Sequence, residues 1–375
     1  MRSKQFGVAA CILLFALGIP NALGANNVVV GVNVVGPDQL PAEQQPALIA
    51  ELHSAGVKVI RSGLVNDKNV EFIIQAYQAG IGTVGLVLPE QIMTGKQKSP
   101  AYRSIGRNWG VPALSDVDTA AAKNAFAPHL AALETAGVRL VGIEVGNEFN
   151  TSAYNGDFKL PGTGRVLGLS DLDNPNDPEG AAIAAGYRNY LQVVAGIKDL
   201  RDHSRLNMAT PIISGGLADI GVAGTVKQGK KTDYVSVSDT LQYLRQHGLD
   251  KLVDGYGVHT YPDADPHQSP SQRASTLEER GVLSACQPGT KPCWITEWGF
   301  SNADKSCPIN DTRRGQLVES ERTAFRQFAQ QGRLGAILYY SWTGMPNDTE
   351  NQWAVYRCGA LTQAGRWAMG PMDVR

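Results

Sequence analysis

The feature that most constrains this chain is a repeated alternation of short, apolar, β-branched runs with longer helical stretches. The short runs have the length and composition of buried strands. The alternation occurs eight times in 375 residues, which is the number of βα units in a closed barrel. We therefore expect a single-domain α/β protein with the (β/α)8 TIM-barrel fold. The expected strands are 28–35, 56–61, 81–88, 141–150, 206–214, 252–260, 293–297 and 334–342, and the expected helices are 41–54, 68–79, 117–135, 179–203, 239–246, 271–283, 312–331 and 362–368.

A doubly wound open sheet is the alternative arrangement of alternating strands and helices. A sheet of that kind that binds dinucleotides carries a glycine-rich turn after its first strand, whereas this chain has Asn33-Val-Val-Gly-Pro37 there. The longest loops, 89–115, 151–178 and 343–361, all follow expected strands. In a barrel they lie on the face that carries active sites, and we expect them to wall a cleft.

The first 24 residues have the composition of an export signal. Arg2 and Lys4 give a basic start, residues 6–19 are almost wholly apolar, and residues 22–24 are small enough for cleavage. We expect a secreted or periplasmic protein whose mature chain begins near Ala25. No later apolar run reaches the roughly 18–20 residues that span a bilayer, so no membrane association is expected after cleavage.

The charge of the chain argues against a nucleic-acid partner. The 34 Lys and Arg residues almost balance the 35 Asp and Glu residues, which gives a formal net charge of -1. Cleavage of residues 1–24 removes two basic residues and no acidic ones, so the mature chain is slightly more acidic. Nothing in this charge balance indicates binding to nucleic acid or to an anionic membrane. We also expect the protein to be a monomer.

Two of the expected strands deliver a glutamate at their carboxyl ends. The stretch 141–150 runs through β-branched residues into Asn147 and Glu148, and the stretch 291–300 runs through an apolar pair into Glu297. A buried strand holds an ionised carboxylate at its end only where solvent, a partner or a substrate meets it. We therefore expect Glu148 and Glu297 to form a pair of carboxylates at the barrel mouth.

Other polar and aromatic residues end the remaining strands. Arg61 ends the second strand, His259 and Tyr261 lie at the end of the sixth, and Trp342 ends the eighth. Each of these alone is compatible with structural pairing or packing. Glu144 lies four residues before the first glutamate and fits equally well as a buried, paired acid. The argument for a site rests on all of them falling at the same end of the barrel.

Four motifs occur in order at these strand ends: Glu144-Val-Gly-Asn147-Glu148, His259-Thr-Tyr261, Trp294-Ile-Thr-Glu297, and Trp342. This ordered set resembles the clan A glycoside hydrolases, and most closely the cellulase-like enzymes of family 5. The resemblance covers essentially the whole mature chain. It departs at Phe149, where a proline usually follows the glutamate, and at 87–89, where many members carry a histidine. Other clan A families with the same barrel and glutamate pair stay open.

The resemblance implies a role for each matching residue. Glu148 is the implied general acid/base and Glu297 the implied nucleophile, with their carboxyl groups about 5–5.5 Å apart as in retaining glycosidases. Among the other residues, Arg61 and Tyr261 would hydrogen-bond Glu297 and keep it ionised. Asn147 would hold the sugar 2-hydroxyl, His259 would support the acid or touch the sugar, and Trp342 would form a platform under the reacting ring.

Aromatic residues on the expected mouth loops are candidates for stacking on sugar rings, although packing explains each of them equally well. We place Trp298, directly after Glu297, among the substrate-binding residues. The other candidates are Tyr102, Trp109, Tyr154 and Trp353.

Four cysteines follow the export signal, an even number that we expect to pair in an oxidising compartment. No CxxC pair occurs and the six histidines are scattered, which disfavours a zinc site. Cys286 and Cys293 precede the body of the seventh strand, whereas Cys307 and Cys358 follow strands. A strand separates these two ends by roughly 17–20 Å, and a disulfide permits only roughly 4.4–6.8 Å between Cα atoms. We therefore expect the disulfides Cys286–Cys293 and Cys307–Cys358.

Together these features indicate a secreted retaining β-glycosidase that cleaves a poly- or oligosaccharide, in the manner of an endo-β-glucanase, without a cofactor or metal. One alternative is an exo-acting β-glycosidase of another clan A family. A second is a barrel that binds glycans without cutting them, and the presence of both glutamates favours an enzyme over it. A metal-dependent barrel hydrolase would need His or Asp ligands on the first strand, and residues 31–34 offer none.

Overall fold

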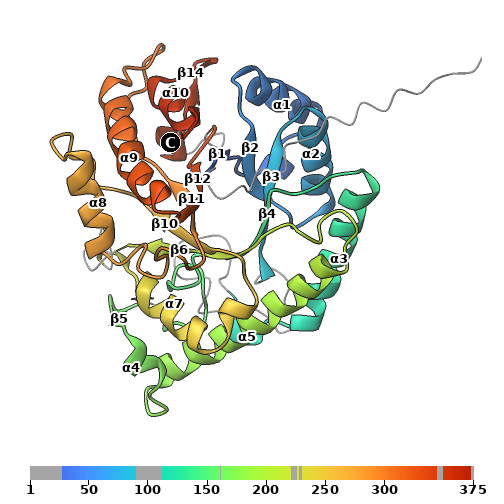
Figure 1. Cartoon of the computed structure of the whole chain (residues 1–375), viewed down its shortest axis with the longest axis vertical. Helices are drawn as coiled ribbons and strands as arrows, with labels where there is room; N and C mark the ends of the chain where they lie inside the picture. Colours follow the sequence, from blue (N-terminus) through green and yellow to red (C-terminus); the bar gives the residue numbers. More distant parts are fainter. Residues whose placement is uncertain are drawn as a thin grey trace, which may run out of the picture.

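Eight parallel strands close into a barrel in the order β1-β12-β11-β10-β6-β4-β3-β2. The computed structural model describes residues 28–89, 112–160, 162–220, 226–227, 230–343 and 349–372. The protein is a single-domain (β/α)8 TIM barrel, which confirms the fold predicted from the sequence (Figure 1). The barrel strands are β1 Val29–Asn33, β2 Val59–Gly63, β3 Gly82–Val87, β4 Gly142–Asn147, β6 Ile212–Asp219, β10 Tyr256–Thr260, β11 Cys293–Trp298 and β12 Leu334–Tyr339.

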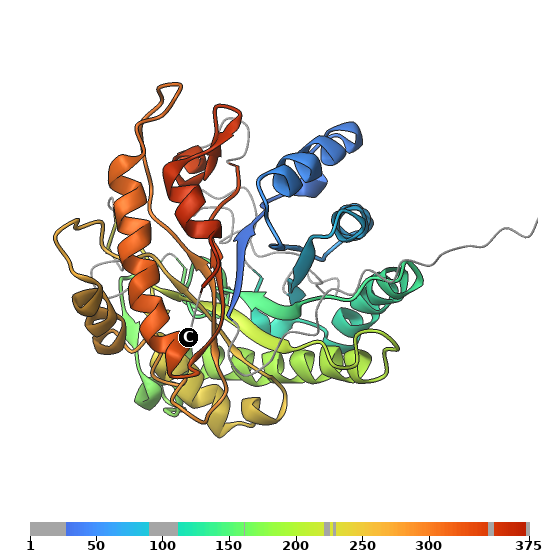
Figure 2. The ribbon, with the colours of Figure 1, turned by 45° about the horizontal axis from the view of Figure 1, so that its top comes forward.

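Helices surround the strands, and α9 and α10 lie side by side next to the last strands in both views of the ribbon (Figures 1 and 2). Most of the helices begin at a short polar residue whose side chain accepts a hydrogen bond from the first turn, as Asn66, Asp118 and Ser236 do. The main helices are α1 Gln45–Ser54, α2 Asp67–Gln78, α3 Thr119–Thr135, α4 Leu169–Leu172, α5 Pro178–Asp202, α7 Val237–Gln246, α8 Pro270–Glu279, α9 Thr312–Gln330 and α10 Gln363–Met369.

Short elements decorate the loops outside the barrel. The 3-10 helix η7, Thr349–Trp353, and the strand pair of β13, Tyr356–Arg357, with β14, Ala360–Leu361, belong to the loop after β12. In the segments that follow β4 and β6, β5, Val166–Leu167, pairs with β9, Tyr234–Val235. These elements matter here because η7 reaches the barrel mouth.

The inside of the barrel is filled by Trp294 of β11, which packs among small and aliphatic side chains of neighbouring strands. Glycine residues in or directly before three neighbouring strands leave space for the indole of Trp294. A Cβ at Gly335 would lie 2.4 Å from the indole, one at Gly255 2.7 Å, and one at Gly142 3.2 Å. The barrel is therefore a packed core below its mouth, and polar side chains gather only above this tryptophan.

The main apolar core lies between the barrel and the helices. It contains large buried side chains from both layers, among them Phe72 of α2, Phe126 of α3, Tyr190 of α5 and Phe325 of α9. No helix within the described ranges has the length and apolar character needed to cross a membrane. The expected export signal, residues 1–24, and the loop aromatics Tyr102 and Trp109 lie outside the described residues.

The fifth strand of the barrel begins later than the sequence predicts. Residues 206–210 form a turn, because the Glu134 carboxylate accepts hydrogen bonds from the backbone of Leu206 and Asn207. The strand β6 starts only at Ile212 and continues to Asp219. About two-thirds of the predicted range 206–214 therefore lies before the strand, whereas the existence and order of the strand are right.

Both disulfides join residues at the same end of the barrel. Cys286 pairs with Cys293, the first residue of β11, across a Cα separation of 5.6 Å. Cys307, in the loop after β11, pairs with Cys358, in the loop after β12, across 5.8 Å. These are the two pairs expected from the sequence, one at the base of the barrel and one at its mouth.

Candidate active site

Seven side chains meet where the barrel strands end. Asn33 ends β1, Arg61 lies in β2, Asn147 ends β4 with Glu148 directly after it, His259 lies in β10 with Tyr261 just beyond, and Glu297 lies in β11. Hydrogen bonds, and a 3.7 Å contact between His259 and Glu297, link them into one network that spans the barrel mouth. Trp298 and Trp342, which the sequence also places on a site, are completely buried, and their side chains take part in none of these hydrogen bonds.

The backbone around Glu148 is held in an unusual conformation. Its φ is 47°, in the left-handed region that few residues other than glycine adopt, and Gly146 two residues before has φ 93°. The amide of Glu148 donates to the carbonyl of Gly216 on β6 at 2.7 Å, which fixes this turn against the neighbouring strand. A non-glycine residue held there points to a functional demand on where its side chain lies.

Arg61 is the centre of the network. Its guanidinium donates from Nε to Glu144 Oε2 at 2.5 Å and from Nη1 to Glu297 Oε1 at 2.6 Å. It also donates to the amide oxygens of Asn33 at 2.9 Å and Asn147 at 3.0 Å. Burial alone would lower the pKa of this arginine, but the two carboxylates raise it overall, so it stays charged.

Glu144 is fully buried beneath the mouth, so it is a paired internal acid. Its second oxygen accepts from the Thr296 hydroxyl at 2.8 Å and the Gly216 amide at 2.9 Å. Every oxygen of this carboxylate therefore has a donor inside the protein. The sequence allowed this interpretation, and the structure shows that Glu144 and Glu297 hold the same guanidinium from two sides.

Glu297 is only slightly exposed, with 11% of its side-chain surface open. Burial would raise the pKa of its carboxyl, but His259, Arg61 and the hydrogen bond from the Tyr261 hydroxyl at 2.7 Å lower it overall. One oxygen bonds Arg61 and the other bonds Tyr261. This carboxylate is thus ionised, fixed in orientation, and able to present an anion to the mouth.

His259 connects the two glutamates. Its Nδ1 lies 2.9 Å from Glu148 Oε1 and 3.7 Å from Glu297 Oε2, and the ring is almost fully buried. Burial would lower the pKa of the imidazole, but Glu297 and Glu148 raise it overall. Space for the ring comes from Gly216, because a Cβ there would lie 2.0 Å from His259 Nε2.

The two carboxylates approach each other closely across the mouth. One oxygen of Glu148, one oxygen of Glu297 and a nitrogen of His259 all lie within 4.8 Å of one another. Three such atoms have a spacing that a metal ion accepts. However, Arg61 places a positive charge 2.6 Å from Glu297, and both oxygens of that residue already accept hydrogen bonds, which opposes a second cation.

The aromatic residues differ most from expectation. Trp298 is completely buried, with its ring against Phe325 of α9 and Tyr339 of β12, so it faces the helix layer and not the mouth. Trp342 is also completely buried and stacks on Tyr356 at 4.9 Å, so it offers no open face to a sugar. Neither tryptophan has an exposed face, and substrate contact by either of them stays a prediction.

Two partly exposed aromatic rings lie beside the network instead. Trp353 contacts the ring of Tyr261 edge to face at 5.0 Å, and Tyr340 contacts the same ring at 6.2 Å. Tyr340 and Asn33 were missed at the level of sequence. Both stand at strand ends, Asn33 as the last residue of β1 and Tyr340 one residue after β12, so the rule that found Arg61 also covers them.

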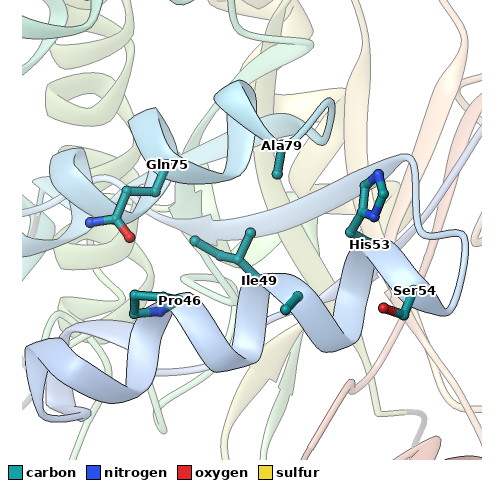
Figure 3. A pocket seen from close by; sticks show the side chains of 7 residues that line it. Pro46, Ile49, His53, Ser54, Gln75 and Ala79 are labelled. Carbon is teal, nitrogen blue, oxygen red and sulfur yellow. The ribbon is translucent and has the colours of Figure 1, made fainter.

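A shallow groove of about 400 Å³ lies on the outer surface between α1 and α2, away from the barrel mouth. Figure 3 shows Pro46, Ile49 and His53 of one helix facing Gln75 and Ala79 of the other. Its lining contains one imidazole and no carboxylate, so it lacks a pair of groups for acid and base chemistry. The acid and base groups that the sequence predicts lie at the barrel mouth.

Comparisons with solved structures find the same barrel fold in several glycoside hydrolases. The chain superposes on a GH5_18 protein of Streptomyces cattleya, solved with GlcNAc, with TM-score 0.55 and 13% identity, covering 92% of this chain and 79% of that one. It superposes on a GH5-4 broad-specificity endoglucanase from an uncultured bacterium with TM-score 0.54 and 15% identity, covering 92% and 94%.

A family 1 β-glucosidase of Thermotoga maritima gives TM-score 0.53 at 12% identity, covering 92% of this chain and 97% of that one. No family model matches the sequence, and no protein of curated function matches it either. Similarity at these identities establishes the shared barrel fold, and the function has to be argued from the residues at the mouth.

Proposed function

We propose that the protein is a retaining β-glycosidase that acts on a poly- or oligosaccharide through Glu148 and Glu297. The observation that carries this proposal is the approach of one oxygen of Glu148 to within 4.8 Å of one oxygen of Glu297. A spacing of about 5–5.5 Å between carboxyl groups is typical of retaining enzymes, whereas inverting enzymes leave about 6.5–9.5 Å for a water. The close approach therefore supports a covalent intermediate.

In the first step, the Glu297 carboxylate attacks the anomeric carbon and Glu148 gives its proton to the glycosidic oxygen. The bond to the leaving sugar breaks, and that sugar departs as an alcohol. In the second step, Glu148 takes a proton from a water whose oxygen attacks the glycosyl ester, which frees Glu297. The surroundings suit these roles, since Arg61 and Tyr261 keep Glu297 ionised and His259 holds Glu148 in place.

Asn147 lies directly before Glu148, and its amide oxygen accepts from Arg61 at 3.0 Å. No hydrogen bond from its amide nitrogen to another described residue is seen, which leaves this nitrogen for a sugar hydroxyl. We propose that it binds the hydroxyl next to the anomeric carbon. The glycoside hydrolases that share the fold support a carbohydrate substrate, and an endo-glucanase mode of action is the form we favour. Exo action remains the alternative within the same chemistry.

We also propose that residues 25–375 form one exported catalytic domain. The two disulfides support this location, because disulfides persist mainly in oxidising compartments. Mass analysis of the protein recovered outside the cytoplasm tests it. The expected mature chain begins near Ala25, and recovery of the intact precursor in the cytoplasm with free thiols would contradict export.

The catalytic proposal is tested by two variants and a control. Glu297→Gln is expected to abolish turnover on every substrate, because no carboxylate remains to form the glycosyl ester. Glu148→Gln is expected to spare aryl glycosides, whose leaving groups need little protonation, while losing polysaccharides. Glu279→Gln changes an exposed glutamate on α8 and serves as the matched control.

The assay is a screen of β-linked polysaccharides with sizing of the products, followed by proton NMR of the sugar first released. Retention of the anomeric configuration and short internal fragments are expected. Wild-type activity in both active-site variants would refute the assignment of the glutamates, and a first product of inverted configuration would refute the double-displacement mechanism.

A further inference from the structure

The loop after β12 brings one tryptophan back over the barrel mouth. The 3-10 helix η7 ends at Trp353, whose ring meets the Tyr261 ring at a centroid distance of 5.0 Å and an angle of 69°. The hydroxyl of that tyrosine donates to Glu297. Trp353 is thus separated from the proposed nucleophile by a single side chain, and it remains partly exposed while Trp298 and Trp342 are buried.

The backbone that carries Trp353 is fixed by the neighbouring loop after β11. The carbonyl of Gln352 accepts from the amide of Asn302 at 2.7 Å and from the guanidinium of Arg314 at 3.1 Å. The carbonyl of Trp353 itself accepts from the amide of Ser341 at 3.4 Å. One peptide group beside this ring is therefore held by the loop after β11 and by α9, and the other by the start of its own loop.

Two further links join the same pair of loops. The guanidinium of Arg357 donates to the carbonyls of Asn302, at 3.1 Å, and Asp304. The disulfide between Cys307 and Cys358 closes the arrangement covalently. An aromatic ring held in this way loses little conformational freedom when a ligand binds, which is the condition under which a stacking contact contributes most to affinity.

We propose that Trp353 is a sugar-binding residue of the active site, whose indole stacks on a pyranose ring next to the one that reacts at Glu297. The ligand class is a β-linked oligosaccharide, because the C–H face of a pyranose is the apolar surface that an indole beside two carboxylates can cover. The loop pair tied by Cys307–Cys358 positions this ring. The inference rests on the proposed function for the place of the reacting sugar.

The kinetic test uses Trp353→Ala and Trp353→Phe, with Trp367→Ala on α10 as the control, since Trp367 is the most exposed tryptophan in the described part of the chain. With the oligosaccharide that the wild-type protein hydrolyses, Trp353→Ala is expected to raise KM about tenfold and change kcat less than about twofold. An aryl monoglycoside, which does not reach the neighbouring ring, is expected to be hydrolysed normally. Trp353→Phe should keep most of the affinity and Trp367→Ala all of it.

A merely structural role gives a different result. If Trp353 acted only by supporting Tyr261, its removal would lower kcat equally on the oligosaccharide and the aryl glycoside, and that outcome overturns the proposal. The double variant Cys307→Ser/Cys358→Ser is expected to raise KM for the oligosaccharide in the same direction as Trp353→Ala. An unchanged KM in this variant would show that the two loops joined by this disulfide do not position Trp353.

Binding without turnover separates this inference from the catalytic proposal. Titration calorimetry with β-linked tetrasaccharides of glucose, mannose and galactose is carried out in the Glu297→Gln background. Trp353→Ala is expected to weaken the Kd of the bound tetrasaccharide about tenfold, or about 1.4 kcal/mol, whether or not the wild-type protein hydrolyses it. An unchanged Kd, or no binding of any of the three by the Glu297→Gln protein with Trp353 intact, overturns the inference.

Discussion

Removal of Arg61 is expected to destabilise the protein strongly at neutral pH. The guanidinium is 4% exposed and bonds Glu144, which is fully buried, and Glu297, which is 11% exposed. Arg61→Met keeps much of the apolar stem of the side chain and removes the charge. Two carboxylates then lose their buried countercharge while the rest of the site stays closed around them.

The size of the effect follows from the surroundings of the two carboxylates. Taking one partner from a buried ion pair typically costs about 3–5 kcal/mol, because the remaining charge is left in a medium of low polarity. Glu144 keeps the donors Thr296 and Gly216, and Glu297 keeps Tyr261, so neither carboxylate is left bare. We therefore expect a loss of about 3–5 kcal/mol in the free energy of unfolding at pH 7, a large share of the roughly 5–15 kcal/mol of a typical domain.

The loss is expected to shrink as the pH falls. In the wild-type protein the pKa of Glu297 is lowered below its ordinary value, so its contribution to stability is complete above the pKa of the unfolded chain, about 4.3, and disappears as the pH falls through the lower folded value. Without Arg61, only His259 and Tyr261 still oppose the effect of burial on Glu297, so the pKa of this carboxyl is higher in the variant than in the wild-type protein. The variant then regains stability as Glu297 takes up a proton, and its deficit at about pH 5 is smaller than at pH 7.

Urea unfolding followed by circular dichroism at both pH values measures the difference. Arg245→Met is the matched control, because Arg245 pairs with Asp250 at 3.2 Å on the surface, where both side chains are more than a third exposed. It is expected to cost less than about 1 kcal/mol. The double variant Arg61→Met/Glu144→Gln removes one of the stranded charges and should lose less than Arg61→Met alone. A cost no greater than that of the control, or one independent of pH, would refute the reasoning.

Two further predictions concern a disulfide and a glycine. Dithiothreitol under native conditions is expected to open Cys307–Cys358 before Cys286–Cys293, because the first pair is exposed and the second is buried; alkylation and mass analysis that found Cys286 labelled first would contradict this. Gly216→Ala is expected to cost about 1–3 kcal/mol of stability and most of the activity, because its Cβ would meet His259 Nε2 at 2.0 Å, whereas Gly196→Ala on α5 should stabilise the protein by about 0.5–1 kcal/mol. Equal melting temperatures for the two alanine variants would show that the ring of His259 is not confined.

The fold followed from the sequence because each strand of a parallel barrel is buried on both faces and appears as a continuous apolar run. Eight such runs were recognisable, and the polar residues that end them fell together at one end. The start of β6 was misplaced because Glu134, a residue of α3, captures the backbone of Leu206 and Asn207. A contact between residues some 70 positions apart leaves no local signal in the chain.

The burial of the two tryptophans has local causes. Successive side chains of a strand point to opposite faces, so Trp298 would point inward like Trp294 and Thr296 if β11 were regular. The pairing of β11 with its neighbours shifts register between Ile295 and Trp298, and the ring of Trp298 lies against the helix layer instead. Trp342 lies three residues beyond the end of β12, where the chain has left the sheet and the alternation no longer applies.

A break in strand alternation also explains why Glu144 and Glu148 have different roles although both belong to one segment. Inside β4 the pleat turns Glu144 inward, toward Thr296 of β11 and Arg61 of β2. A regular strand would point Glu148, four residues on, the same way and one level higher. The positive φ values at Gly146 and Glu148 break that regularity, and the Glu148 carboxylate instead reaches His259 on β10. Glu144 thereby holds Arg61 from below, and Glu148 stays open to the mouth. This division depends on the backbone geometry at Gly146 and Glu148 and not on the types of residue in the motif.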